Sequence, residues 1–176
     1  MSHKIKTTLA LLSLTAALQA DISFGITQAT FADGDPGYGF NMSTEWSFYS
    51  PEAAKGLQIG MVMDMGYFTL GEVKNLNDDA GLLVDLDLLA SYSFAEHGAP
   101  LRLYTGIGYG LGIIGSDAYD GLNYQAGAEY NFGDSWGMGL KYIHNDADLS
   151  LAGVDTDLDI YVLYVNLHPV AKRSTK

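Results

Sequence analysis

The fold is decided by one stretch of the sequence, LRLYTGIGYGLGII at residues 101–114. Because side chains alternate across an extended strand, its residues divide into two sets. One face receives Leu101, Leu103, Ile107, Tyr109, Leu111 and Ile113, and the other receives Arg102, Tyr104, Gly106, Gly108, Gly110 and Gly112. A solvated face normally carries long polar side chains, whereas alternate glycines suit a wall against which other side chains crowd. We expect the glycine face to line a narrow barrel and the apolar face to meet lipid.

Three glycines of this region, Gly110, Gly112 and Gly115, also match the spacing of a dinucleotide-binding loop. Such a loop needs a helix directly after the glycines, because the amino terminus of that helix faces the pyrophosphate. The residues that follow, SDAYDG at 116–121, are a turn sequence instead. The two-residue period of the glycines explains the match, and no cofactor is expected.

Composition limits the class of protein. The chain has 176 residues and no cysteine, so we expect one domain without disulfides or thiolate chemistry. Residues 1–20 begin with Lys4 and Lys6, continue with an apolar run and end at Ala20, which is typical of a signal peptide. Without those two lysines the net charge falls from −12 to −14, which argues against nucleic acid as a partner. No later apolar run approaches the roughly 18 residues of a spanning helix, so a membrane would be crossed by strands.

Seven further stretches show the same two-residue period, at 22–31, 38–48, 57–67, 82–94, 122–132, 136–142 and 158–167. Their outward rows contain no Lys, Arg, Asp or Glu, and one basic residue at the bilayer centre would cost roughly 2–4 kcal/mol. The last stretch sets Asp157, Asp159 and Tyr161 opposite Leu158 and Ile160, but its second half is apolar on both faces, which leaves its register open.

An even number of strands can close on itself. The sequence therefore predicts an all-β fold, an eight-stranded antiparallel up-and-down transmembrane β-barrel at residues 21–168. A signal peptide at 1–20 would precede it, and a basic C-terminal tail at 169–176 would follow. Side chains fill the interior of so small a barrel, so no permanent pore is expected.

Aromatic residues give an independent indication of a membrane. If the mature chain starts in the periplasm, the strand ends on that side carry an aromatic girdle of Trp46, Phe48, Tyr92, Phe94, Tyr130, Phe132 and Trp136. An outer ring would consist of Tyr38, Tyr67, Tyr109, Tyr124 and Tyr142. Such rings are typical of the two membrane boundaries. The alternative, a soluble β-sandwich with an aromatic core, predicts no clustering at strand ends.

Three segments carry a resemblance to a known family: YTGIGYG at 104–110, NYQAGAEYNF at 123–132 and GMGLKY at 137–142. In these the chain resembles the small outer-membrane β-barrel superfamily of Gram-negative bacteria, which includes OmpA transmembrane domains and OmpX-like proteins. The resemblance implies location in the cell outer membrane and a monomeric state. It also implies outer-membrane lipid, lipopolysaccharide and the outer-membrane assembly machinery as partners.

The C-terminus departs from the family pattern. Members commonly end on an aromatic residue that the assembly machinery reads, whereas the last strand here is followed by HPVAKRSTK at 168–176. The assembly signal would then lie internally, at 161–167.

Charges on the inward faces need partners, because a buried charge is tolerated only when it is paired. Members of the superfamily hold salt bridges inside the barrel. In this sequence inward Arg102 and Lys141 would face inward Glu45 and Glu129. We expect these residues to be structural rather than catalytic.

Three further carboxylates share the inward parity on two adjacent strands, namely Asp64, Asp85 and Asp87, and Asp157 and Asp159 would join them from the last strand. Carboxylates so close together in a poorly solvated interior cannot all stay ionised. At least one is expected to bind a proton, a cation or trapped water. In the alternative interpretation, water and interior hydroxyl groups satisfy all of them.

Two classes of function fit such a barrel. The first is a non-enzymatic outer-membrane protein with a role in envelope integrity or surface interaction, without catalytic, cofactor-binding or metal-binding residues. The acidic outer loops could bind divalent cations that bridge lipopolysaccharide phosphates. A solvated surface is the more ordinary role of aspartate in turns.

The second class is a lipid hydrolase, since lipid A deacylases share this barrel. They use an outward histidine near the outer leaflet, with a serine two residues further on. His144 has the required lipid-facing parity, but position 146 is Asp, and Ser150 lies in a loop without fixed geometry. We therefore expect a non-enzymatic protein in which His144 is an interface residue.

Overall fold

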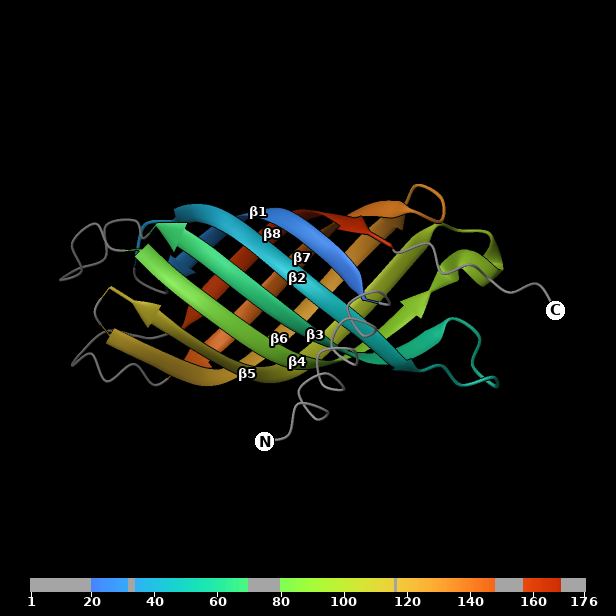
Figure 1. Ribbon diagram of the computed structural model, residues 1–176, viewed down its shortest axis with the longest axis horizontal. Coiled ribbons are helices and arrows are strands. Elements are labelled where there is room, and N and C mark those ends of the chain that lie inside the picture. The colour runs from blue at the N-terminus through green and yellow to red at the C-terminus, as the bar shows by residue number, and fades with distance from the viewer. Residues whose placement is uncertain (1–19, 32–33, 70–79, 116, 148–156, 169–176) are drawn as a thin grey trace, which may run out of the picture.

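The computed structural model describes residues 20–31, 34–69, 80–115, 117–147 and 157–168, which form a closed barrel of tilted strands (Figure 1). The strands are β1 (Asp21–Phe31), β2 (Gly37–Tyr49), β3 (Leu57–Thr69), β4 (Ala80–Ser93), β5 (Leu101–Ile114), β6 (Asp117–Asn131), β7 (Trp136–Ala147) and β8 (Leu158–Leu167). Each strand pairs antiparallel with its sequence neighbours, and β1 pairs with β8 to close the sheet. The predicted eight-stranded up-and-down β-barrel is confirmed. The predicted tail at 169–176 and the predicted signal peptide, apart from Ala20, lie outside the described residues.

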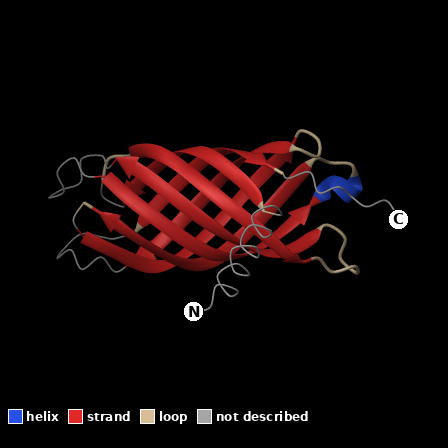
Figure 2. Ribbon diagram, viewed as in Figure 1, coloured by secondary structure: helices blue, strands red, loops and turns tan. Residues whose placement is uncertain are grey.

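Strands make up nearly all of the described chain, with a single short 3-10 helix, η1 (Phe94–His97), between β4 and β5 (Figure 2). We call the end where β1 begins and β8 ends the inner end, and the end where β3 ends and β8 begins the outer end. Within the described residues, no helix is both long and apolar enough to cross a membrane.

The outer surface is apolar because the rows assigned to lipid point outward. On β4, Leu82, Leu86 and Leu88 are each about half exposed, and on β5 Ile107 and Leu111 are equally exposed. Apolar surface of this extent is unstable in water and is stable against hydrocarbon. Because the sheet is closed, its backbone hydrogen bonds leave no strand edge facing lipid.

The inward glycines of β5 lie under larger side chains from neighbouring strands, as the sequence predicts. A Cβ atom on Gly106 would lie 3.0 Å from the Gln125 side chain and 3.1 Å from that of Leu89. A Cβ atom on Gly112 would lie 3.2 Å from the Leu83 side chain. The glycine face therefore provides the room in which β4 and β6 place their inward side chains.

The two halves of the lumen differ in chemistry. An apolar cluster that reaches the outer end contains Ala29, Phe68, Leu83, Ile114, Ile143, Leu158, Ile160, Val162 and Tyr164. Polar and charged side chains, with Val62 and Leu89 among them, occupy most of the inner half and the middle, and Asn145 lies farther out on β7 than Ile143 of the cluster. The interior is therefore a packed core in which charged groups must find partners.

Strand β8 has the opposite parity from the one suggested by its first half. Leu158, Ile160 and Val162 point inward and are almost completely buried, whereas Tyr161 and Leu163 are 52% and 44% exposed. The reason is that β8 pairs with β1 and β7 without a register shift, so one parity holds along its whole length. The apolar row of its second half continues the outer surface and fixes the orientation of the first half.

Two expectations are therefore wrong. Asp159 faces outward and does not enter the interior, and Asp157 precedes the first residue of β8. The outward rows are also not free of acidic residues, because Asp120, Asp146 and Asp159 lie on them near the outer end of the barrel. Carboxylates at this level can reach the polar membrane boundary, where charge costs far less than at the bilayer midplane.

Candidate functional site

The first interior ion pair joins strands on different sides of the barrel near the inner end. Arg102 on β5 donates to both carboxylate oxygens of Glu45 on β2, with 3.0 Å between Nη1 and Oε2. Its Nη2 also donates to Ser91 Oγ at 3.0 Å, and its guanidinium lies 5.5 Å from the centre of the Tyr104 ring. Since β2 and β5 share no backbone pairing, this side-chain contact links them directly.

The second ion pair lies in the middle of the lumen. Lys141 on β7 donates to the Asp64 carboxylate on β3 and, at 2.8 Å, to Ser43 Oγ. Gln125 Nε2 lies 3.4 Å from the other carboxylate oxygen of Asp64. Lys141 thus pairs with Asp64, whereas the sequence had placed it opposite Glu129.

Glu129 is held by uncharged donors and lies near a histidine whose Nε2 is hydrogen-bonded to Asn131 Oδ1 at 2.8 Å. Its Oε2 accepts hydrogen bonds from Tyr164 Oη at 3.2 Å and from Asn166 Nδ2 at 2.9 Å. Its Oε1 lies 3.5 Å from His168 Nε2. His168 Nδ1 in turn lies 3.2 Å from Asp21 Oδ2, and this hydrogen bond raises the pKa of His168 above its ordinary value of 6.5, against the opposing effect of burial.

His168 follows the last strand, and sequence reasoning assigned it no role. Its ring connects the first residue of β1 to β6, and its backbone nitrogen donates to the Ser135 carbonyl oxygen at 2.9 Å. The only signal in the sequence was a histidine directly before Pro169, which is too common a pattern to interpret. We call the contact of His168 with Asp21 and Glu129 the inner clamp.

The remaining inward carboxylates belong to Asp85 and Asp87 on β4. Asp85 is paired directly with Asp64 across the β3–β4 ladder, and Gln125 Nε2 donates to Asp87 Oδ2. Asp85 Oδ1 and Asp87 Oδ1 have no hydrogen-bond partner in the described part of the chain. The predicted grouping of Asp64, Asp85 and Asp87 thus divides into one ion-paired residue and two without a basic partner.

The lumen is closed within the described residues. A cavity of about 20 Å³ lies between the two ion pairs, lined among others by Ser23, Tyr104 and Tyr164, and has room for about one water molecule. Side chains of the apolar cluster fill the outer half.

A second polar cluster lies on the outward face near the outer end, and we call it the rim cluster. His144 Nδ1 is 2.8 Å from Asp159 Oδ1, and Tyr142 Oη donates to the same oxygen at 2.7 Å. His144 and Asp159 are directly opposite each other on β7 and β8, with side chains about one third exposed. Because the contact uses Nδ1, Nε2 is the ring nitrogen left to act as a base or a donor.

Sequence reasoning identified His144 but missed Asp159 as its partner, because it placed Asp159 inside the barrel. The row Leu163, Val165, Leu167 was the available signal, since it sets the outward parity of β8. The neighbour of His144 at the position of a catalytic serine is Asp146, which is exposed, and Ser150 lies outside the described residues.

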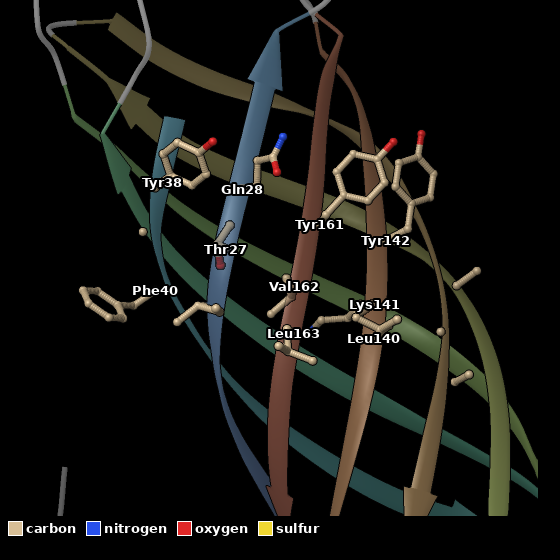
Figure 3. Close-up of a pocket in the computed structure, with 15 residues that line it drawn as sticks. Thr27, Gln28, Tyr38, Phe40, Leu140, Lys141, Tyr142, Tyr161, Val162 and Leu163 are labelled. Carbon is tan, nitrogen blue, oxygen red and sulfur yellow. The ribbon is translucent and has the colours of Figure 1, made fainter. Parts of the chain in front are cut away.

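An apolar groove of about 890 Å³ lies on the lipid-facing surface beside the rim cluster (Figure 3). Its outer edge carries the Gln28 amide and the hydroxyl groups of Tyr142 and Tyr161, and Leu140 and Leu163 lie further toward the inner end. The groove continues across β6, where outward residues are small: Ala126 and Ala128. A groove of this shape and lining suits an acyl chain.

The aromatic residues predicted to form the girdle belong to strand ends and a turn at the inner end. Tyr92 and Phe94 contact edge to face at 4.9 Å between ring centres, and Phe132 stacks on Trp136 at 4.4 Å. Tyr130 completes this second group at 5.0 Å from Phe132. The other members of the predicted girdle are Trp46 and Phe48 at the end of β2.

The described residues contain no group of three or more His, Asp or Glu side chains with the geometry of a metal site. The rim cluster has two such residues, and the inward aspartates are divided between an ion pair and unpaired carboxylates.

No protein-family model matches the sequence, and no curated protein matches it significantly. Solved structures match the fold. Ail, the attachment invasion locus protein of Yersinia pestis, superposes with a TM-score of 0.57 at 17% identity, over 84% of this chain and 96% of Ail. The outer membrane enzyme PagL gives a TM-score of 0.57 at 17% identity, over 84% of this chain and 98% of PagL. Neisserial surface protein A gives 0.51 at 15% identity, over 85% and 95% of the two chains.

Identities this low establish shared architecture and leave activity open, since small barrels of one fold serve different functions. The matches include an enzyme and proteins whose names denote attachment and surface exposure. The chain therefore has the fold of the small eight-stranded outer-membrane β-barrels, as the resemblance in its sequence implied.

Proposed function

We propose that this protein is a closed, non-enzymatic barrel of the outer membrane that contributes to envelope integrity or surface interaction. The observation that supports this function best is the filled lumen. Two ion pairs cross it, the cavity between them has room for about one water, and apolar side chains occupy the outer half. Such an interior makes a rigid membrane anchor and offers no route for transport.

The experiment is a conductance measurement on the refolded protein in planar lipid bilayers, with a porin as positive control. We expect no stepwise conductance, because opening a path would break the Arg102–Glu45 and Lys141–Asp64 pairs. Stable channels of uniform conductance would contradict the closed barrel.

The envelope role is tested in cells that lack the gene. These cells should take up more of a hydrophobic fluorescent dye, and the intact gene should restore the barrier. An unchanged barrier would contradict a role in envelope integrity and would favour surface interaction, which a screen of lipopolysaccharide and host-surface ligands would then address.

A second candidate function is hydrolysis of a lipid ester, favoured by the rim cluster. Asp159 orients His144 through Nδ1, the arrangement in which the other ring nitrogen acts as a general base. The adjacent groove could hold the acyl chain of a substrate at the same membrane level. Among the described residues no serine is hydrogen-bonded to His144, whose Nδ1 contact is with Asp159, so we take water as the attacking group.

Mass spectrometry of lipid A from cells that overproduce the protein separates the two candidates. The non-enzymatic proposal expects lipid A of unchanged mass, with or without His144→Ala. Loss of an ester-linked acyl chain that His144→Ala abolishes, and that Asp159→Asn reduces, would establish the hydrolase instead.

A further inference from the structure

The interior of the barrel contains more buried negative charge than its bases can neutralise. Arg102 is engaged by Glu45, and Lys141 is engaged by Asp64. Asp85 and Asp87 are each 1% exposed and have no ion pair with any described residue. A buried ionised carboxylate without a compensating charge is too costly to persist, so these two groups must bind either protons or a cation.

Two inward glycines of β5 lie directly against these carboxylates. Asp87 Oδ1 lies against the position that a Cβ on Gly108 would occupy, and Asp85 Oδ1 lies against the same position on Gly110. Asn145 Oδ1, from β7, is 3.0 Å from that Gly110 position. Oxygens from two strands therefore converge over one glycine, and an added methyl group there would collide with them.

The amide side chains around this space are an independent sign of a missing ligand. Asn123 and Asn145 are directly paired on β6 and β7, and both side chains are completely buried. Neither the oxygen nor the nitrogen of the Asn145 amide has a hydrogen-bond partner among the described residues. Since buried amides are almost always satisfied, the unpaired Asn145 oxygen indicates a bound species that contacts it.

We propose that a hard divalent cation, best matched by Ca²⁺, binds in the lumen among Asp85, Asp87, Asn123 and Asn145. Carboxylate and amide oxygens are the ligands that Ca²⁺ uses, and it tolerates the irregular geometry that four separate side chains on three strands impose. Mg²⁺ fits less well, because it requires near-octahedral geometry at shorter distances. Two positive charges balance the two carboxylates that no base compensates.

A cation accounts for observations that protons alone leave open. Protons would neutralise Asp85 and Asp87 one group at a time, whereas one cation can contact both the Asp85 carboxylate and the Asn145 oxygen, which lie together at Gly110. A single ion near Gly110 could be coordinated by the Asp85 carboxylate and by the Asn145 amide oxygen together. The apolar cluster in the outer half of the lumen separates this site from bulk solvent at that end, so the ion should exchange slowly.

The test uses the mature full-length chain refolded in detergent, treated with EDTA and then equilibrated with CaCl₂ up to about 1 mM, the upper range for extracellular calcium modules. Bound metal is counted by elemental analysis after removal of free ion. We expect one Ca²⁺ per chain. Asp85→Asn and Asn145→Ala should each weaken binding by about tenfold or more, which corresponds to the loss of one good ligand. Asp120→Asn is the matched control, since it alters an exposed outward carboxylate, and it should bind Ca²⁺ as the parent does.

Urea unfolding gives a second readout on the same samples. In EDTA, Asp85→Asn should be more stable than the parent, because it removes a repulsion and keeps an acceptor. With Ca²⁺ the parent should gain stability and the variant should not, so that the order reverses. Folding of each variant is checked on SDS gels, where the unheated folded barrel migrates differently from the heat-denatured sample.

Three results would overturn the proposal. One is the absence of stoichiometric Ca²⁺ in the parent. Another is binding that Asn145→Ala leaves unchanged, which would place the ion on the acidic surface. The third is an Asp85→Asn variant equally stabilised with and without Ca²⁺, which would mean that protons neutralise the pair. The measurement on the parent stands even if a variant fails to fold.

Discussion

Replacing Arg102 should show how strongly the interior charges hold the barrel together. The guanidinium is 8% exposed and forms two hydrogen bonds to Glu45 and one to Ser91. Arg102→Met keeps most of the apolar stem but leaves the Glu45 carboxylate, 13% exposed, without its base. Breaking a buried ion pair from one side typically costs about 3–5 kcal/mol, and we expect a loss of unfolding free energy in that range.

A double variant distinguishes the energy of the Arg102–Glu45 ion pair from the packing energy of the Arg102 stem. Glu45→Gln in the Arg102→Met background removes the uncompensated charge, so the double variant should recover to within about 2 kcal/mol of the parent. The double variant should then be more stable than Arg102→Met by at least about 1–3 kcal/mol, and Glu45→Gln alone completes the cycle that gives the coupling energy. A matched control is Lys55→Met in the exposed β2–β3 turn, which should change stability by less than about 0.5 kcal/mol.

The assay is urea unfolding of the protein refolded into lipid vesicles, followed by the fluorescence of its two tryptophans. The reasoning would be refuted if Arg102→Met lost less than about 1 kcal/mol, or if the double variant were as unstable as the single one. Either result would mean that water or another group already compensates Glu45 in the parent.

Three other changes test the lipid face, the glycine face and the inner clamp by the same unfolding assay. On the lipid face, Leu86→Arg should cost about 2–4 kcal/mol or block assembly, and a neutral effect would contradict the membrane orientation. On the glycine face, Gly108→Ala drives its Cβ into the Leu86 carbonyl oxygen and should cost about 1–3 kcal/mol. Its control, Gly66→Ala, meets only a ring carbon of Phe68 at 4.0 Å and should stay within about 1 kcal/mol of the parent. In the inner clamp, the folded state raises the pKa of His168 above 6.5, so the folded barrel favours the protonated imidazole. The stability that His168 contributes is therefore complete below about pH 6.5 and is lost as the pH rises through the raised pKa. His168→Gln should flatten the fall in unfolding midpoint between about pH 6 and pH 9, and an unchanged profile would exclude the clamp as its source.

Much of the barrel can be predicted from local patterns, because the parity of a strand is a property of the strand itself. The apolar row of β5 and its glycine face could be assigned before any pairing was known, and so could the inward parity of Asp64 and Arg102. The register between strands could not be assigned in this way. It depends on how all eight strands tilt and close together, and therefore on contacts between residues far apart in the chain.

The sequence by itself determined the architecture of this protein, since strands with a mainly apolar outward row can satisfy all their backbone groups in lipid only when the sheet closes into a barrel. The tertiary structure decided which charges meet. Lys141 reaches Asp64 rather than Glu129 because shear displaces the strands along one another, and Asp159 lies beside His144 because β8 takes its parity from the lipid-facing half. Alternation specifies the face of each side chain, but its partner across the lumen is set by barrel closure, which no single strand encodes.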